Sequence, residues 1–271
     1  MKRSTRGCLV QVVLAIALCS VLCGLAWWFL SCFQDAFLDA VYGGDREKVE
    51  RLLKTGENPN KRDSFGNNPL TLAGFANQSE IAELLIAHGA CLTIQDNQGM
   101  TPLHCAAYNG NIDVARVFIA HGAPINATNE FGHTPLSEAV AKGPPAMVEL
   151  LLAHGADVHH RDARGWQPIH IAVRAGGLES AERCAIVAAL LDHGADPNAS
   201  NPGGCLKDSD SCLGSRSRRN PNKGETPLVI AESNGFTEIA ELLKNHGATT
   251  EKSEPPDGGD ARDDRTTDHV D

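Results

Sequence analysis

The chain has 271 residues, enough for one or two ordinary domains, and its formal net charge is −10. A chain this acidic lacks the Lys/Arg-rich face on which phosphate binding depends, which excludes nucleic acid as the main partner. Its nine cysteines show neither an evenly spaced disulfide framework nor the paired C-x-x-C spacing of a structural zinc site. We therefore expect no metal and no cofactor.

The N-terminus has the pattern of a membrane anchor. Residues 1–7 carry Lys2, Arg3 and Arg6, and residues 8–33 are apolar except for three polar positions. This run exceeds the roughly 20 residues that a helix needs to cross a bilayer. Acidic residues follow it, so the positive-inside rule predicts a cytoplasmic N-terminus and export of everything after the anchor.

Two other interpretations of this segment stay open. A signal peptide could be cleaved after Ala26, or a lipoprotein could be modified at Cys19 or Cys23. Cleavage would leave an apolar new N-terminus starting at Trp27, and leucines rather than small residues precede the two cysteines. An uncleaved signal-anchor helix is therefore preferred.

A repeat of 33 residues follows the anchor. Gly66, Gly99, Gly132 and Gly165 lie 33 residues apart, each three residues before a proline, and a fifth copy begins at Gly224. Every repeat closes with a His-Gly-Ala triplet. The triplets start at His88, His121, His154, His193 and His246.

The clearest copy runs from Asp96 to Ala123. Its Asp-x-x-Gly start predicts a tight turn at Gly99, and Pro102 is suited to the first turn of a helix. Gly110 is expected to end that helix in a left-handed conformation. A second helix then buries apolar side chains against the next unit. These are Ile112, Val114, Val117 and Phe118.

This copy, with Thr-Pro-Leu-His at residues 101–104, resembles the ankyrin repeat, and the resemblance covers residues 35–248. It implies an all-α solenoid of helix-turn-helix-β-turn units that stack because no single unit can bury its apolar face. It also implies protein binding, with no enzymatic activity and no small-molecule substrate. The expected repeats are 35–62, 63–95, 96–128, 129–161, 162–200 and 201–248.

Several departures from the repeat can be located in the sequence. The first unit lacks the turn motif and is expected to be a capping unit. The second has Asn68, Thr71 and Asn77 where Thr, His and Gly are usual, and Asn adopts a left-handed cap at higher cost. About six extra residues near 177–184 should lengthen the second helix of repeat five or its approach. A loop of about 20 residues, near 201–222, is inserted before the last helix pair.

The histidines have structural explanations. The histidines before Gly-Ala lie in the last turn of a helix, where they should bond the open backbone carbonyls. Stacked repeats place these histidines about 10 Å apart, which is too far for them to share one metal ion. The resemblance implies that His104 and His170 bond neighbouring backbone. His133, His159 and His160 are expected in surface loops, with metal binding or a pH response as the alternative. No nucleophile, base and orienting group are expected to converge on one pocket, so the sequence predicts no catalytic site.

The inserted loop and the C-terminus suggest two further features. Cys205 and Cys212 would form a disulfide in an oxidising compartment, or stay as free thiols in a flexible loop. The basic residues at 216–219 form a solvated patch or contact an acidic partner. Residues 249–271 lack apolar periodicity and should be a disordered acidic tail.

In the family that the repeats resemble, partners contact the turn tips and the end of the first helix, on the concave side of the stack. Aromatic and Arg side chains recur at these positions and are typical of interface anchors. Packing on the adjacent turn is the alternative role. The predicted partner-binding residues are Phe65, Phe75, Met100, Tyr108, Phe131, Trp166 and Arg174.

The sequence thus predicts a single-pass membrane protein whose six repeats bind an unknown protein partner on the exported side. The architecture looks like that of bacterial inner-membrane ankyrin proteins with a periplasmic array, some of which are associated with peroxide defence. The alternatives are an immunity or inhibitor protein that neutralises a toxin or enzyme at the membrane, and a stress-defence accessory protein.

Overall fold

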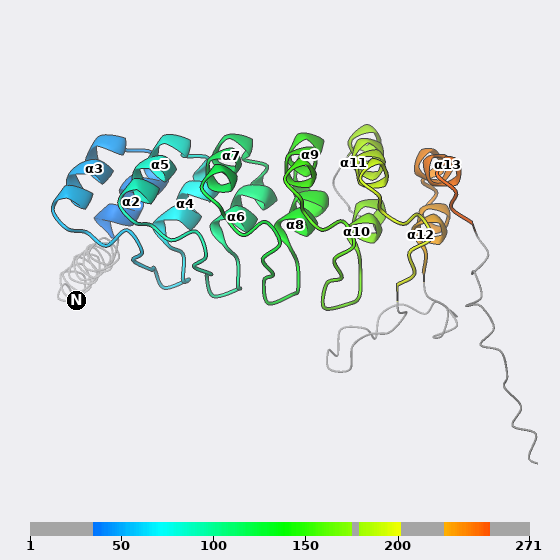
Figure 1. Ribbon diagram of the computed structural model, residues 1–271, viewed down its shortest axis with the longest axis horizontal. Coiled ribbons are helices and arrows are strands. Elements are labelled where there is room, and N and C mark those ends of the chain that lie inside the picture. Colours follow the sequence, from blue (N-terminus) through cyan, green and yellow to red (C-terminus); the bar gives the residue numbers. More distant parts are fainter. Residues whose placement is uncertain (1–34, 175–178, 202–224, 250–271) are drawn as a thin grey trace, which may run out of the picture.

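The computed structural model describes residues 35–174, 179–201 and 225–249. Within these ranges all regular structure is helical, and the helices come in six antiparallel pairs stacked side by side (Figure 1). The first helices of the pairs are α2 (Ala36–Gly43), α4 (Pro69–Ala76), α6 (Pro102–Asn109), α8 (Pro135–Lys142), α10 (Pro168–Arg174) and α12 (Pro227–Ser233). The second helices are α3 (Arg46–Lys54), α5 (Ser79–Ala87), α7 (Ile112–Ala120), α9 (Pro145–Ala153), α11 (Ser180–Asp192) and α13 (Thr237–Asn245). The predicted all-α solenoid is confirmed.

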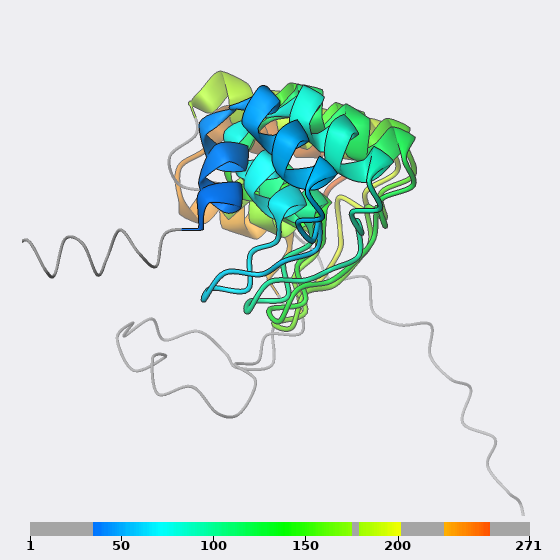
Figure 2. The same cartoon turned by 90° about the vertical axis from the view of Figure 1, so that its left-hand side faces the viewer.

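The two kinds of helix form two layers, and extended turn segments protrude beyond the layer of first helices (Figure 1). We call these segments fingers two to five, after the repeat whose first helix each one precedes. Figure 2 shows that they extend side by side from the same edge of the helical layers. The fingers are residues 57–68, 90–101, 123–134 and 156–167.

Local sequence determines where each first helix begins and ends. In repeat three the hydroxyl of Thr101 accepts a hydrogen bond from the His104 amide, and Pro102 occupies the first turn. Gly110 ends α6 with φ of 70°. The first helix of repeat four, α8, ends differently. Its cap residue Gly143 precedes Pro144 and is extended, at φ −82° and ψ 164°.

The fingers are joined to one another at their tips. The amide of Asn97 donates to the carbonyl of Phe65 at 3.1 Å, and the amide of Glu130 donates to Gln98 at the same distance. This close approach requires glycine at the turn. A Cβ on Gly99, where φ is 76°, would lie 2.8 Å from the backbone nitrogen of Glu130. The fingers therefore form a continuous row with fixed spacing.

One apolar core runs the length of the stack. The residue after each proline that starts a first helix is at most 1% exposed, as are Phe118 and Leu151 in the second layer. Gly74 lets α4 approach its neighbour, since a Cβ there would lie 2.9 Å from the carbonyl oxygen of Pro102. The core residues after the prolines are Leu70, Leu103, Leu136, Ile169 and Leu228. Stacking of the repeats is what buries them.

Repeats two and five show the departures expected from their sequences. Asn77 ends α4 at φ 54° and is the one non-glycine residue with positive φ in the described part of the chain. Asn68 takes the capping role of threonine, because its Oδ1 accepts from the Thr71 amide at 3.0 Å. Helix α11 has 13 residues where α9 has nine, which accommodates four of the extra residues of repeat five.

Across residues 35–174, 179–201 and 225–249, no helix combines the length and apolar character needed to cross a membrane. The predicted anchor at residues 8–33 lies outside the described residues, as do Cys205, Cys212, the basic residues at 216–219 and residues 250–271 of the predicted tail.

Candidate protein-binding surface

The first helices present one side chain from the same position in every repeat, six residues after the first residue of the helix. In repeats one to three this position is aromatic. Tyr42 is 60% exposed, Tyr108 is 39% exposed, and Phe75 between them is half-buried. Because the helices stack in register, these three rings follow one line along the solenoid. We call them the aromatic column.

Tyr42 is a surface residue that the sequence analysis missed. Repeat one has no Gly-x-x-Pro turn from which its positions can be counted. The signal that could have found it is the cap of α2: Gly44, at φ 79°, lies 66 residues or two repeats of 33 before Gly110. That alignment places Tyr42 in register with Tyr108.

The tips of fingers two and four carry exposed phenylalanines. Phe65 is 73% exposed and Phe131 is 54% exposed, and each precedes the positive-φ glycine of its turn. The equivalent tip residues of fingers three and five are Gln98 and Arg164, both exposed. Phe65 and Phe131, the predicted tip residues, thus offer apolar area to a partner from alternate fingers, two and four.

The position after the turn glycine is less accessible. Met100 is only 8% exposed, and its sulfur accepts a hydrogen bond from Nδ2 of Asn129 at 3.3 Å. Trp166 is half-buried, with the guanidinium of Arg174 4.8 Å from its ring centre. Met100 therefore packs between fingers and offers little surface, whereas Trp166 and Arg174 form an accessible pair. For convenience, the exposed side chains of the first helices and finger tips are called the first-helix face.

A buried ionic cluster lies at the base of fingers four and five. Nδ1 of His133 is 3.0 Å from the Glu138 carboxylate, and its Nε2 is 3.5 Å from the Asp162 carboxylate. Asn129 also donates to Glu138 at 3.0 Å. The side chains of Glu138 and Asp162 are only 10% and 3% exposed. The imidazole therefore bridges two neighbouring repeats.

Electrostatics in this cluster favour the charged forms. Hydrogen bonding to Asp162, and then to Glu138, raises the pKa of His133 to about 9. Burial opposes ionisation of Asp162, yet hydrogen bonds from His133 and from the backbone lower the pKa of its carboxyl. His133 thus acts as an imidazolium between two carboxylates. No group of three or more His, Cys, Asp or Glu in the described ranges is arranged to hold a metal ion.

The other buried histidines are neutral bridges. Nδ1 of His104 accepts from the Thr101 amide at 3.1 Å, and its Nε2 donates to the carbonyl of His133 at 3.0 Å. His170 bonds the carbonyl of Ala199 in the same way at 3.0 Å. Burial lowers the pKa of both imidazoles. Both residues therefore have the structural role that the resemblance implied.

The histidines of the His-Gly-Ala triplets cap the second helices. In four of the five, Nδ1 lies 2.8–3.0 Å from the carbonyl four residues earlier, as expected. These are His88, His154, His193 and His246. Of the two loop histidines, His159 is exposed, whereas His160 bonds the Gly132 carbonyl at 2.9 Å and links fingers four and five.

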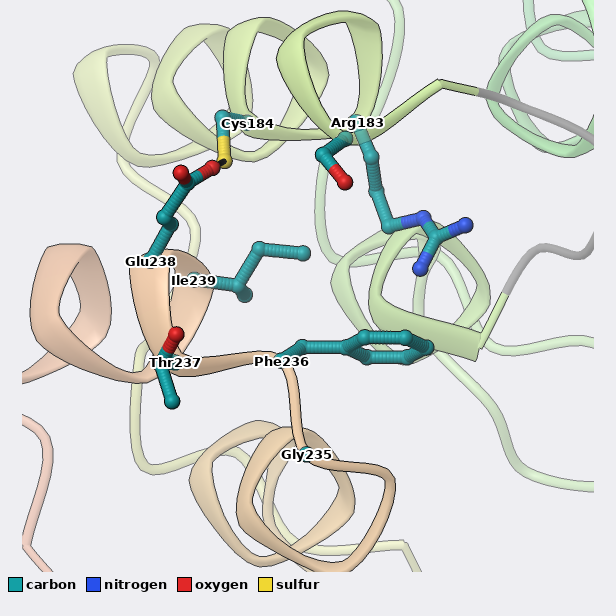
Figure 3. A pocket seen from close by; sticks show the side chains of 8 residues that line it. Arg183, Cys184, Gly235, Phe236, Thr237, Glu238 and Ile239 are labelled. Carbon is teal, nitrogen blue, oxygen red and sulfur yellow. Dashed lines mark hydrogen bonds between the residues drawn. The ribbon is translucent and has the colours of Figure 1, made fainter.

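A pocket of about 160 Å³ lies in the second layer, between α11 and α13. Figure 3 shows Arg183 above the ring of Phe236, and Cys184 facing Glu238. The guanidinium carbon of Arg183 is 4.3 Å from the centre of the Phe236 ring. The sulfur of Cys184 is 3.8 Å from that carboxylate. Burial and the adjacent negative charge raise the pKa of the thiol, so Cys184 is not an activated nucleophile.

Comparison with known proteins identifies the repeat. The family model for ankyrin repeats (three copies) matches residues 37–129 and 117–201. The chain belongs to the ankyrin repeat family. The predicted ankyrin fold is therefore confirmed, and it is shared with a crystal structure of an ankyrin repeat domain from Acinetobacter baumannii. That domain is 29% identical with a TM-score of 0.65, over 79% of this chain and 98% of the domain.

Among curated proteins, an ankyrin repeat-containing protein of Saccharomyces cerevisiae is 43% identical over 47 residues. This segment is 17% of the present chain and 9% of the yeast protein. The similarity therefore concerns the ankyrin repeats alone. Ankyrin repeats are in general non-enzymatic modules for protein interaction, and the repeats suggest a protein-interaction scaffold.

Proposed function

We propose that this protein is a membrane-anchored scaffold whose ankyrin array binds a protein partner through the first-helix face. One observation carries the proposal. The large hydrophobic residues that are exposed in the described ranges all lie on first helices or finger tips, and none lies in the second-helix layer. They are Tyr42, Phe65, Tyr108, Phe131 and Val229.

This distribution is what a binding surface requires. Val229 stands at the position that His104 and Ser137 occupy, where earlier repeats are covered by the next repeat. The other four are aromatic and lie on the first-helix face. Isolated exposed apolar residues are normal, but the confinement of the aromatic ones to one face indicates a site that a partner covers. Aromatic side chains also bring large contact area at low cost in conformational entropy, which is why interface energy concentrates on them. The aromatic column and the two phenylalanine tips thus support a partner lying along the stack.

A crosslinking experiment tests which face is used. A photo-crosslinking amino acid is placed at Tyr108, on the first-helix face, or at Arg116, which is exposed on α7 in the second layer. We expect a crosslinked protein from position 108 and none from position 116 in cells. Equal crosslinking at both positions would contradict the proposal. A single stoichiometric partner would favour the immunity or inhibitor alternative.

A paired substitution measures the contribution of the surface. Replacing Tyr108 and Trp166 together with Ala removes two rings that the core does not depend on. The photo-crosslinking amino acid is now placed at Phe65. We expect the double variant to lose the crosslinked partner there, while its helical circular dichroism stays unchanged. Unchanged capture by the folded double variant would reject the surface.

The membrane part of the proposal rests on the apolar run at residues 8–33 and the charges that flank it. This pattern supports an array on the exported side, which would be the periplasm in a bacterial host. Alkaline phosphatase fused after residue 248 should be active, and green fluorescent protein fused there should be dark. The reverse pattern would overturn the orientation without affecting the binding surface.

A further inference from the structure

Two cations lie over aromatic rings on the first-helix face. The ammonium of Lys142, on α8, is 5.8 Å from the ring centre of Tyr108, and Arg174, on α10, is 4.8 Å from that of Trp166. Both cations are exposed, and α8 and α10 are packed neighbours. Within the described residues neither cation makes a salt bridge. Their charge is therefore available to a partner.

Arg164 adds a third exposed cation at the tip of finger five. Of the four carboxylates of this region, Glu138 and Asp162 are buried around His133, and Glu130 and Asp157 are exposed, in fingers four and five. Lys142, Arg164 and Arg174 thus outnumber the two exposed carboxylates, in a chain that has 34 acidic and 24 basic residues.

The N-terminal half of the same face is different. Among the residues that the structure describes, no cation lies over the ring of Tyr42 or Phe75, and the exposed residue one turn before Tyr42 is Asp39. A partner along the face would therefore meet apolar aromatic surface over repeats one to three and cation-aromatic pairs over repeats three to five. At about 10 Å per repeat, α2 to α10 spans roughly 40 Å. About 12 extended residues cover that distance.

We propose that the partner presents a linear acidic segment, with carboxylates over Lys142, Arg164 and Arg174 and apolar side chains over the aromatic column. A guanidinium stacked on an indole keeps its N–H edge free for a bidentate bond to a carboxylate. The ring beside it contacts an adjacent apolar side chain. This inference rests on the proposed function and specifies the chemistry of the partner.

A selection experiment tests the chemistry without knowledge of the partner. Random 16-residue peptides displayed on phage are selected against the purified full-length protein. We expect the enriched peptides to contain an excess of Asp and Glu next to Leu, Ile, Phe or Trp. The most enriched peptide is then synthesised and its affinity is measured at low and high salt. Affinity should fall as salt rises, because exposed charges are screened.

Charge-reversal variants locate the peptide. Arg174→Glu and Lys142→Glu should each weaken binding by roughly tenfold, since a charge pair is replaced by repulsion. Arg116→Glu makes the same change on the exposed side of α7 and should alter binding less than twofold. Arg174→Gln removes the charge without repulsion and should give an intermediate loss. Thermal melting of each variant confirms that the array stays folded.

The outcomes separate this inference from the proposed function. Neutral or basic peptides that lose binding in Tyr108→Ala overturn the acidic segment and keep the scaffold. Peptides insensitive to both Tyr108→Ala and Arg174→Glu overturn both proposals. Failure to enrich any peptide overturns the linear segment. A synthetic peptide of residues 249–271 is measured as well; if it binds more tightly than the selected peptides, the occupant is this chain's own terminus and a separate partner is rejected.

Discussion

Repeats three and four join their C-terminal neighbours with different chemistry at the same place in the fold. In repeat three the neutral ring of His104 reaches the next finger and bonds the carbonyl of His133. Repeat four has Ser137 at that position, and its hydroxyl bonds only within its own turn, to Thr134. The connection to repeat five includes an ionic bridge between His133 and Asp162, beside the bond from His160 to the Gly132 carbonyl. A neutral imidazole and an ionic cluster can therefore each join neighbouring fingers.

The ionic junction should be the more sensitive to loss of one member. His133→Leu leaves the buried carboxylates of Glu138 and Asp162 without their cation. Breaking a buried ion pair in this way costs about 3–5 kcal/mol of unfolding free energy. We expect a loss in this range, measured by urea denaturation of the purified protein followed by circular dichroism.

A second substitution shows whether the loss comes from uncompensated charge. His133→Leu combined with Glu138→Gln removes one of the two stranded carboxylates while it keeps a group that can accept from Asn129. This double variant should be more stable than His133→Leu alone. If the second substitution instead adds to the damage, the ionic account of the junction is wrong.

The neutral junction should lose less. His104→Ala removes the bonds to Thr101 and to the His133 carbonyl and leaves a small cavity, so we expect a loss of about 2–3 kcal/mol. Ser137→Ala at the equivalent position breaks only a bond inside its turn, and about 1 kcal/mol is expected. Equal losses at the two positions would show that the imidazole does not couple the fingers.

The two junctions should respond to pH in opposite directions. The pKa of His133 is raised from 6.5 to about 9, so its stabilisation is complete below pH 6.5 and is lost as pH rises through 9. The pKa of His104 is lowered, so its contribution is present above pH 6.5 and is lost on acidification. Between pH 5 and 9.5, the free-energy difference between the wild type and His133→Leu should shrink by about 3 kcal/mol.

Urea titrations of the wild type, His133→Leu and His104→Ala at pH 5, 7.5 and 9.5 measure these changes. The difference between the wild type and His104→Ala should be smaller at pH 5 than at pH 7.5. A constant difference between the wild type and His133→Leu over this range would contradict the assignment of His133 as an imidazolium bridge.

The repeat pattern predicted the fold well because its key residues act locally. Gly99 and Pro102 specify a turn and a helix start wherever they occur with this spacing, and Phe65 and Phe131 are exposed because tip residues have no neighbour to cover them. Met100 was harder to predict. Its position in the finger is readable, but its burial depends on Asn129 in the next finger.

The ionic cluster could not be predicted for a related reason. His133 and Asp162 are 29 residues apart, and the period places them in adjacent fingers. Whether an imidazole lies between two carboxylates depends on side-chain lengths and rotamers across that gap, which no sequence spacing encodes. The cations over Tyr108 and Trp166 depend on the same kind of contact between repeats.

Repeat two offers the smallest test, because its junction uses neither bridge. Thr71 stands where His104 and Ser137 do, and its buried hydroxyl has no hydrogen-bond partner among the described residues. Asn68 instead makes a contact to the next finger, through the Ile94 carbonyl at 3.4 Å. Thr71→Val keeps the shape and removes the unsatisfied group, so stability should rise by up to about 1 kcal/mol. A rise in the urea midpoint at unchanged slope is the expected result. A fall in stability of similar size would show that the hydroxyl bonds a water molecule or a neighbouring group. The junction between repeats two and three would then depend on a polar bridge, as the junctions after repeats three and four do.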